Sequence, residues 1–562
     1  MNNMKRINYF FGILLAIVAL ASCKKNFLDR PPLSSITDAN FYKTDDQVLA
    51  ATAALYNAVW FSYNDQAMYQ IGDFRGGTAF DAWYDNANSK FNTTPDNAHN
   101  ITSWKAFFTV VAQSNLAIYN INRFAGPGVS AEVKKRGIAE ARFMRALAYR
   151  FLVSNWGAVP IIENNFEHLN DTSIVRNTVP SVWRFITREM KSIIADLPST
   201  ASQPGRLTKW SAEGMLARFY LTRAGVESTG GVRNQQFLDS AKYYAADVIN
   251  NSPYALLSNY EDLFKWDGKT GAGYDNNKES LFELQWVVSS GWGVGNSMVD
   301  QIAYSNEIAY GGWGNSKGAT WWILEQYEGF TQQPDGTIKG RTLDQRLHAT
   351  YMLPGFYYPE MTKKSDGSKF IYPYVTGDNN YVAIKKYVVG GPADFGATAA
   401  QQRYPNDTYM MRVAELYLIY AEAALGNNSS TSDATALAYF NKVRTRAGLP
   451  EWSLSRNGPL TLDAILSERF KEFAMEGMTW YDIVSLHYWN PTKALNILNS
   501  QDRGLFVARP NQMPNPSEWT FEKTSWFNPR MIVANEGNFV MPIPNVELSQ
   551  APNLQRPPVD YP

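Results

Sequence analysis

The sequence predicts a mainly α-helical fold, in which tetratricopeptide-like helix pairs carry an irregular, loop-rich lobe with few short strands. Two observations lead to this prediction. Several stretches repeat apolar residues at spacings of three and four, with alanine and tyrosine prominent among them. Between those stretches, roughly over 61–105 and 260–410, the chain is rich in Gly, Asn, Asp, Pro, Trp and Tyr.

The N-terminal half contains four helical patterns. The first covers 45–60, and the second is an apolar series over 138–152 that Gly157 would end. Two further runs, 210–220 and 240–248, repeat the combination of small and aromatic side chains. Small residues let helices approach closely and rings fill the remaining gaps, so we expect these helices to pack in pairs.

The C-terminal third gives the clearest helical hairpin. An apolar stripe over 413–424 is followed by a glycine and a polar loop, and Ser432 or Asp433 can cap the next helix, over 437–447. Thr461 is the expected cap of a further helix. No strict 34-residue period is present, so any repeats are degenerate.

The segments between the helices contain only short strand-like runs, at 281–288 and 381–389. Long irregular segments in compact proteins are usually functional or disordered, and a high aromatic content disfavours disorder. The chain has 17 Trp, 32 Tyr and 30 Phe. We therefore expect one loop-rich lobe mounted on the helical scaffold.

Composition excludes several functional classes. The 562 residues include 52 Lys and Arg and 52 Asp and Glu, giving a formal net charge of +0. A nucleic-acid partner held through its phosphates requires a basic excess, so we expect none. The single cysteine cannot form an intramolecular disulfide, and the four histidines lack metal-ligand spacing. We expect no metal site and no cofactor.

The first residues resemble an export signal. Two basic residues precede an apolar run over 9–20, which is too short to cross a bilayer, since about 20 residues are needed. Small residues followed by Cys23 resemble a bacterial lipobox, in which the thiol is acylated. We expect removal of 1–22 and lipidation of Cys23, which would tether 23–562 to a membrane outside the cytoplasm. The alternative is a plain secretory peptide with a chance cysteine.

Motifs that would indicate catalysis are weak. Residues 314–318 match G-x-S-x-G, but no buried strand precedes them, as a nucleophile elbow requires. Residues 268–270 imitate the end of a phosphate-binding loop, but Leu263 stands where its first glycine is required. Acidic pairs such as Asp262 and Asp267 are expected by chance among 52 acidic residues. We therefore predict that the protein is not an enzyme.

Several stretches, in order, resemble one known family. They are CKKNFLD at 23–29, GIAEARFMRALAY at 137–149, MRVAELYLIYAEA at 411–423, NKVRTRAGLP at 441–450, residues 468–482, and PIPNVE at 542–547. Together they span nearly the whole chain. In these stretches the chain resembles the RagB/SusD family of outer-membrane nutrient-binding lipoproteins.

The resemblance implies both a fold and a partner. It implies four tetratricopeptide-like helix pairs supporting a ligand-facing lobe, with an N-terminal SusD-like part over 23–330 and a C-terminal RagB/SusD part over 331–562. It also implies a lipid-anchored protein of the outer membrane, exposed at the cell surface, that captures glycans. Its partner would be a SusC-like TonB-dependent transporter, over which it sits as a lid. The chain departs from the family pattern in having Lys24 and Lys25, rather than acidic residues, after Cys23.

The family's motifs do not identify the residues that bind ligand, so we choose the candidates from this sequence alone. A flat aromatic ring can cover the apolar face of a sugar while Asp, Asn and Arg bind its rim hydroxyls, and Gly-rich loops can expose such rings. Burial in the core is the alternative for each ring. The candidates are Asp73, Arg75, Asp81, Trp83 and Tyr84 in the first loop region, and Trp292, Tyr304, Tyr310 and Trp313 in the second.

Three functional hypotheses remain open from the sequence. The first is a binding protein that holds an oligosaccharide or polysaccharide at the cell surface without changing it chemically. The second is a surface glycoside hydrolase, which needs two carboxylates about 5 to 9.5 Å apart in the aromatic cleft. The third is a tetratricopeptide-type peptide-binding scaffold, because grooves of such helix pairs commonly hold chain segments.

Overall fold

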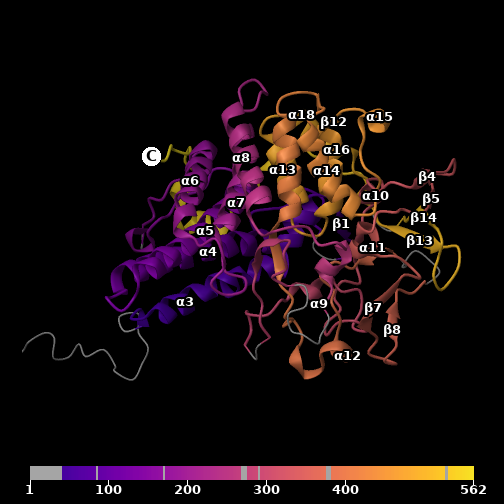
Figure 1. Ribbon diagram of the computed structural model, residues 1–562, viewed down its shortest axis with the longest axis horizontal. Helices are drawn as coiled ribbons and strands as arrows, with labels where there is room; N and C mark the ends of the chain where they lie inside the picture. The colour runs from indigo at the N-terminus through magenta and orange to yellow at the C-terminus, as the bar shows by residue number, and fades with distance from the viewer. Residues whose placement is uncertain are drawn as a thin grey trace, which may run out of the picture.

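The computed structural model describes residues 41–83, 86–168, 171–266, 275–288, 291–374, 381–525 and 529–562. Cys23, the signal segment 1–22 and Tyr84 lie outside the described residues. Long helices occupy the left and top of the view in Figure 1, and short strands and short helices gather at its right and bottom. The predicted mainly α fold with few short strands is confirmed.

Long helices make up the N-terminal half, and each of the last five begins with a capping side chain. They are α3 (Asp45–Ala53), α4 (Ala98–Phe124), α5 (Ala131–Trp156), α6 (Val179–Ser192), α7 (Lys209–Val226) and α8 (Gln235–Asn251). The caps of α4 to α8 are Asn97, Ser130, Thr178, Thr208 and Asn234. Gly157 follows α5 with φ of 67°, a conformation that favours glycine, and ends the helix as predicted.

The C-terminal helices include the three that the sequence predicts. The predicted three are α13 (Val413–Leu425), α14 (Ala434–Arg446) and α16 (Leu462–Glu472), and α17 (Thr479–His487) and α18 (Pro491–Ser500) follow them. Asp433 Oδ1 accepts a hydrogen bond from the Ala436 N–H at 2.7 Å, so it is the cap of α14. Thr461 Oγ1 accepts from the Ala464 N–H at 3.3 Å and caps α16. Both predicted caps are confirmed, with Asp433 rather than Ser432 at the start of α14.

Consecutive helices pack in pairs across the described residues. The pairs are α4 with α5, α7 with α8, α13 with α14, and α17 with α18. Helix α8 also packs on α13, which joins the N-terminal helices to the C-terminal ones. One continuous hydrophobic core runs from Leu55 to Met541. The predicted tetratricopeptide-like pairing is therefore confirmed.

The segment 61–105 is more regular than the sequence predicts. A π-helix spans Tyr63–Arg75, and α4 already begins at Ala98. Met68, Ile71 and Phe74 of the π-helix are fully buried. Hydrogen bonds from i to i+5 widen each turn, so the apolar residues do not follow the spacing of an α-helix. The prediction of an irregular loop is wrong for this stretch.

The strands form several small antiparallel sheets. One has the order β1 (Ala79–Asp81), β3 (Lys317–Ala319), β9 (Ala383–Ile384) and β6 (Tyr351–Met352). Another has the order β13 (Phe506–Pro510), β14 (Trp519–Lys523), β5 (Ile338–Gly340) and β4 (Phe330–Gln332). The two-stranded sheets pair β10 (Thr408–Arg412) with β2 (Ser280–Leu284), β7 (Tyr357–Thr362) with β8 (Lys369–Ile371), and β11 (Ser430–Thr431) with β12 (Leu460–Thr461). The predicted strand-like run 281–288 overlaps β2, and the run 381–389 contains β9.

Short helices lie between and after these strands, and the C-terminus returns to the N-terminal helices. The short helices are α9 (Met298–Ile302), α10 (Trp321–Leu324), α11 (Arg346–Thr350), α12 (Pro392–Phe395), α15 (Leu454–Asn457) and α19 (Asn545–Gln550). The Thr178 N–H donates to the Val559 carbonyl at 3.0 Å, which places the chain end beside α6 (Figure 1). Within the described residues, no helix is both long and apolar enough to span a bilayer.

Candidate functional site

Three indole rings stand out at the surface. The side chains of Trp83, Trp292 and Trp313 are 57%, 59% and 39% exposed, and they are the tryptophans that the described part of the chain leaves exposed. A large apolar ring at the surface loses the free energy of burial, so a group of them indicates a contact surface. All three belong to the candidate residues predicted from the sequence.

Strand pairing brings two of these rings to one end of a sheet. Strands β1 and β3 pair antiparallel, with Asp81 opposite Lys317. Trp83 lies two residues after the end of β1, and Trp313 lies in the loop that enters β3. Because antiparallel strands place the end of one beside the start of the other, both tryptophans leave the sheet at the same edge.

A buried ion pair connects the two loops. Lys317 Nζ lies 3.4 Å from Asp81 Oδ2 and donates to the Trp313 carbonyl at 3.1 Å. Asp81 Oδ1 accepts from the Trp83 N–H at 3.1 Å and from the Ser316 hydroxyl at 2.7 Å. Burial lowers the pKa of Lys317, and the carboxylate of Asp81 opposes this effect. Asp81 is 1% exposed, so it positions the loops instead of contacting a ligand.

The third exposed ring lies on a different loop. Trp292 stands between Val287 and Val294, whose backbones are joined by a hydrogen bond of 3.0 Å. Its ring meets Phe61 edge-on, with centroids 5.1 Å apart. Gly293 has φ of 90°, which favours glycine at the turn. The turn at Gly293 leaves the indole exposed, and Phe61 supports one side of its ring.

The two candidate tyrosines are more enclosed than the tryptophans. The half-buried Tyr304 ring packs edge-on against Tyr372, with centroids 5.1 Å apart. The Tyr310 N–H donates to the Tyr404 hydroxyl at 2.7 Å, and the Tyr310 hydroxyl donates to the Gly396 carbonyl. These contacts hold both rings in place, and each retains part of its surface for contact.

The prediction that Asp73 and Arg75 bind ligand is corrected, because both residues lie in the interior, on the π-helix. Asp73 accepts hydrogen bonds from the backbone N–H groups of Met475 and Gly477 at 2.7 and 2.8 Å. Burial raises the pKa of Asp73 to about 7. The Arg75 guanidinium stacks 4.6 Å from the Trp480 ring centroid and is 2% exposed. Both residues join the π-helix to neighbouring segments, so we leave them out of the candidate site.

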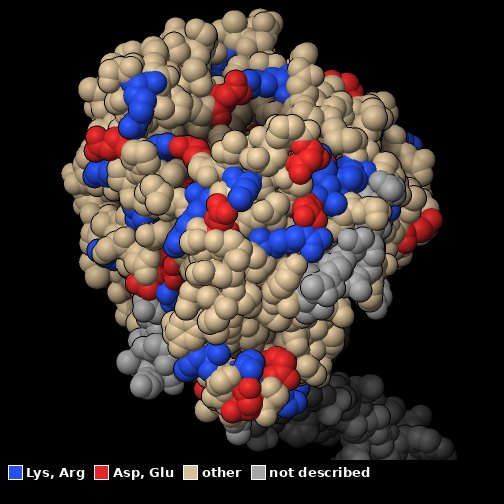
Figure 2. All heavy atoms as spheres, turned by 90° about the vertical axis from the view of Figure 1, so that its right-hand side faces the viewer, with Lys and Arg blue, Asp and Glu red and all other residues tan. Residues whose placement is uncertain are grey.

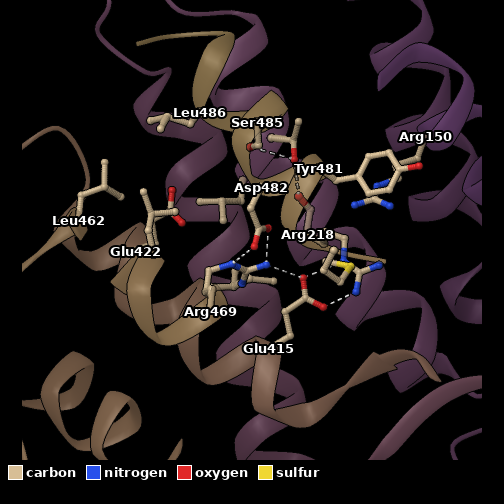
Figure 3. A pocket seen from close by; sticks show the side chains of 15 residues that line it. Arg150, Arg218, Glu415, Glu422, Leu462, Arg469, Tyr481, Asp482, Ser485 and Leu486 are labelled. Atoms are coloured by element: carbon tan, nitrogen blue, oxygen red, sulfur yellow. Dashed lines mark hydrogen bonds and ion pairs between the residues drawn. The ribbon is translucent and has the colours of Figure 1, made fainter. Parts of the chain in front are cut away.

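A small cavity among the C-terminal helices is an ion-pair network, not a ligand site. Arg218 and Arg469 both donate to Glu415, and Arg469 also binds Asp482 through two hydrogen bonds of 2.9 and 2.7 Å (Figure 3). The cavity has a volume of about 30 Å³, enough for one or two water molecules. Arg218, Glu415, Arg469 and Asp482 bind one another, so the network joins α7, α13, α16 and α17.

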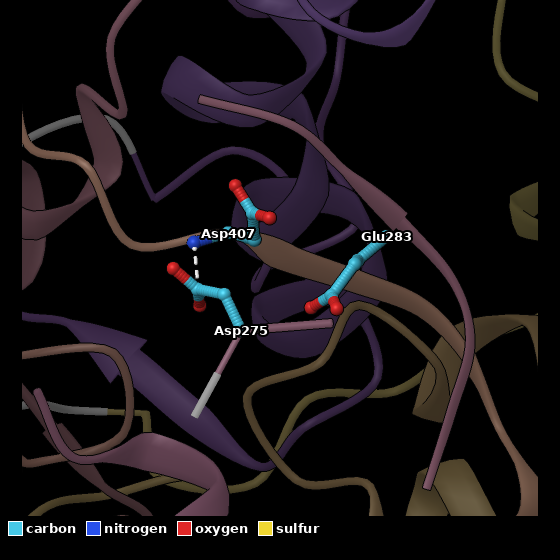
Figure 4. Close-up of side chains that lie close together, drawn as sticks. All are labelled: Asp275, Glu283 and Asp407. Carbon is cyan, nitrogen blue, oxygen red and sulfur yellow. Dashed lines mark hydrogen bonds between the residues drawn. The ribbon is translucent and has the colours of Figure 1, made fainter. Parts of the chain in front are cut away.

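Larger cavities open near the strands. One of about 510 Å³ is lined by Phe330, His348, Phe356 and Trp519 among others. Another, of about 700 Å³, contains Asp275 and Asp407, which with Glu283 form a group of three carboxylates (Figure 4). Among the described residues, this is the group of His, Cys, Asp and Glu side chains with the spacing to hold a metal ion. Sequence analysis missed this group, because Asp407 is more than a hundred residues away from Asp275 and Glu283 in the chain.

The strand side of the molecule carries mixed charge. Figure 2 shows Lys and Arg lying beside Asp and Glu on this face, with most of the surface formed by other residues. Interspersed charges of both signs create no extended positive potential. On this face the surface agrees with the neutral overall composition.

Comparison with known proteins gives matches along the whole chain. The family model described as "SusD family" matches residues 278–559, and the model described as "Starch-binding associating with outer membrane" matches 26–221. A SusD-like protein of Bacteroides ovatus is 35% identical over 566 residues, which cover 98% of each chain. The starch-binding protein SusD of Bacteroides thetaiotaomicron is 25% identical over 67% of this chain and 69% of its own.

Solved structures agree with these matches. A crystal structure with a xylogluco-oligosaccharide is 33% identical, with a TM-score of 0.78, and the match covers 92% of this chain and 99% of that one. A laminarin-binding SusD-like protein, 21% identical with a TM-score of 0.64 over 91% of this chain and 99% of its own, shows the same fold. The family model and the full-length relative support one conclusion: this chain belongs to the SusD family.

Proposed function

We propose that the protein is a cell-surface lipoprotein that binds oligosaccharide or polysaccharide and delivers it to a SusC-like TonB-dependent outer-membrane transporter. The observation that carries the proposal is the set of three exposed indoles, Trp83, Trp292 and Trp313. Trp83 and Trp313 lie in loops at the ends of the paired strands β1 and β3, and loops fixed in this way suit a rigid platform for a ligand.

The chemistry of an indole suits a sugar ring. The broad apolar face of tryptophan covers the C–H groups on one face of a pyranose, and the ring N–H donates to a hydroxyl. Several such rings spaced over a surface can engage successive sugars of one polymer, so individually weak contacts add through effective concentration. The half-buried Tyr304 and Tyr310 add phenol rings to the same lobe.

The relatives suggest which ligands to test first. A structure 33% identical to this chain holds a xylogluco-oligosaccharide, and the B. thetaiotaomicron relative is named a starch-binding protein. We propose a glucan as the ligand class, with xyloglucan as the first ligand to test, since the protein in that complex is the more similar of the two.

The carboxylates near the exposed rings favour binding over hydrolysis. Asp81 is buried and paired with Lys317. Asp300, whose carbonyl accepts from the Trp313 N–H, is also buried, and its carboxylate accepts from the backbone N–H groups of Gly311 and Gln402 at 2.8 and 2.7 Å. A glycosidase needs two carboxyl groups that reach the scissile bond. Both of these carboxylates are occupied in holding loops, so we propose that the protein is not an enzyme.

The anchor and the transporter partner extend this proposal. Lipidation of Cys23 would hold the protein at the outer membrane, and one matched family model is named for association with that membrane. The helical scaffold carries the loop-rich lobe on one side, and this arrangement is consistent with a lid over a transporter.

Binding of the mature protein, without its signal segment, to a panel of polysaccharides tests the proposal. Residues 24–562 would be examined by affinity electrophoresis and calorimetry with xyloglucan, starch, laminarin and unrelated polymers. We expect saturable binding to a glucan with no release of reducing ends. Absence of binding to every polysaccharide contradicts the proposal, and release of reducing ends favours the hydrolase. Capture of a peptide that glycans do not displace favours the peptide-binding scaffold.

A further inference from the structure

We propose that Asp275, Glu283 and Asp407 bind a divalent cation, with Ca²⁺ as the ion that their chemistry fits. Asp275 lies in the segment that enters β2, Glu283 lies within β2, and Asp407 precedes β10 directly. Figure 4 shows the three side chains close together beside the paired strands, with the Asp407 N–H donating to the Asp275 carboxylate at 3.0 Å.

The spacing of the oxygens suits one ion. Each residue offers a carboxylate oxygen, and these three oxygens all lie within 4.8 Å of one another. Ca²⁺ binds oxygen at 2.3–2.6 Å, so ligand oxygens on opposite sides of one ion lie roughly 5 Å apart. The antiparallel pairing of β2 with β10, which sets Leu284 opposite Thr408, fixes the backbones that carry Glu283 and Asp407.

One oxygen of the group lacks a hydrogen-bond donor. Glu283 is 1% exposed, and its Oε2 atom has no hydrogen-bond partner among the described residues. Its other oxygen accepts from the Asn276 N–H. A buried carboxylate oxygen without a donor costs free energy comparable to a lost hydrogen bond, and a bound cation would remove that cost. This oxygen is therefore a second indication of a ligand.

The group also lacks a positive partner. Elsewhere in the interior, Glu279 and Glu472 both form ion pairs with Arg412. By contrast, the three carboxylates make no ion pair with any Lys, Arg or His in the described part of the chain. Burial raises the pKa of all three carboxyl groups, and repulsion among them adds to the effect for Glu283 and Asp407.

The ligand types and the access favour Ca²⁺ over a transition metal. The group contains oxygen donors alone, and the amide side chains of Asn276 and Gln285 lie beside it. Hard oxygen donors suit Ca²⁺ and Mg²⁺, and Ca²⁺ accepts more ligands in a less regular geometry. The cavity of about 700 Å³ that Asp275 and Asp407 line gives an ion and its waters a path from solvent.

The proposed cation would also stabilise the loop of an exposed ring. Asp407 Oδ1 accepts from the Trp286 N–H at 2.7 Å, and the chain continues from Trp286 into the loop of Trp292. An ion held by Asp407 would fix the start of that loop. This consequence rests on the proposed function, whereas the cation site does not.

Calorimetry tests the site directly. The mature protein, without its signal segment, is treated with EDTA and then titrated with CaCl₂, and a titration with MgCl₂ is the comparison. The variants are Glu283→Gln and Asp407→Asn. Glu213→Gln is the matched control: Glu213 is also buried with an unpartnered Oε2, but its charged neighbours are one carboxylate, Asp247, and one cation, Lys209. Terbium luminescence excited through the adjacent Trp286 is the second readout.

We expect one Ca²⁺ per chain, weaker Mg²⁺ binding, and a loss of Ca²⁺ affinity of roughly tenfold or more in both site variants. The control should bind as the wild type does. If the two site variants do not fold, Asp275→Asn, at the least buried of the three positions, provides the same comparison. No saturable Ca²⁺ binding by the wild type, or unchanged affinity in a folded site variant, overturns the proposal. No glycan is present, so either result leaves the proposed function untouched.

Discussion

Lys317 and Asp81 form a buried ion pair that binds the backbones of two exposed tryptophans. The side chains are 7% and 2% exposed, and the Nζ to Oδ2 distance is 3.4 Å. Lys317 also binds the backbone of Trp313, and Asp81 binds that of Trp83. One pair of charges therefore sets the relative position of two loops from distant parts of the chain.

Replacing Lys317 by Met should both destabilise the protein and weaken glycan binding. The change leaves Asp81 buried without its cation, and breaking a buried pair costs about 3 to 5 kcal/mol. Urea unfolding measures the free energy, and calorimetry measures the affinity. Lys339→Met is the control, because Lys339 pairs with Glu518 at the surface and should contribute less than about 1 kcal/mol. Equal effects of the two changes would refute the role of the buried pair.

Replacing Trp83 or Trp313 by Ala should weaken glycan binding without destabilising the fold. A stacked ring at the centre of a binding surface typically contributes about 2 kcal/mol or more, so we expect a fall of roughly tenfold or more in affinity. The rings are exposed, and the free energy of unfolding should change by less than about 0.5 kcal/mol. Tyr243→Ala, at an exposed ring on α8, is the control. Unchanged affinity in both tryptophan variants would exclude them from the binding surface.

Replacing Arg412 by Met should cause a large loss of stability. Its buried guanidinium forms ion pairs with Glu279, Glu472 and Glu476, and the change leaves these carboxylates short of a cation. We expect a loss of about 3 to 5 kcal/mol in urea unfolding. The control is Arg509→Met, whose partner Glu522 is 35% exposed; there we expect less than about 1 kcal/mol. A small effect at Arg412 would show that the network is not needed for folding.

Stability should fall steeply below about pH 4.5. Burial opposes ionisation of Glu472, but Arg446, Arg412 and Arg346 outweigh it and lower the pKa of Glu472 to about 2. The pKa of Glu415 is likewise lowered to about 2, because Arg218 and Arg469 outweigh its burial.

A carboxyl with a lowered folded pKa binds its proton more weakly when folded. Its contribution to the free energy of unfolding is therefore complete above the pKa of the unfolded state, near 4.5. This contribution is lost as the pH falls towards the folded pKa of about 2. Urea unfolding at intervals from pH 6 to 2.5 measures this slope. Constant or rising stability below pH 4.5 would contradict it.

Replacing Cys23 by Ala should release the protein from the membrane. Without the thiol, acylation cannot occur, and the proposed lipid anchor is lost. Fractionation of cells expressing the two forms measures the change, with an unrelated lipoprotein as a marker for the membrane fraction. Retention of the variant in that fraction at the wild-type level would contradict lipid anchoring at Cys23.

Local sequence signals predicted the helices well. Asp433 and Thr461 cap their helices as expected, and Gly157 ends α5, because a cap depends on hydrogen bonds within one turn. The prediction was wrong over Tyr63–Arg75, where the wider turn of a π-helix changes the apolar spacing. That error also placed Asp73 and Arg75 in a surface loop.

The sequence by itself determined the helix pairs, the family and the candidate rings, because apolar spacing, caps and ordered motifs are all local in the chain. Only the tertiary structure decided that Trp83 and Trp313 face solvent while Asp73 is buried, since exposure depends on what packs against each side chain. It also brought Asp275 and Glu283 to Asp407, more than a hundred residues away in sequence, through the pairing of β2 with β10. Local sequence patterns carry no information on which distant strands will pair, because that choice depends on the packing of the whole core.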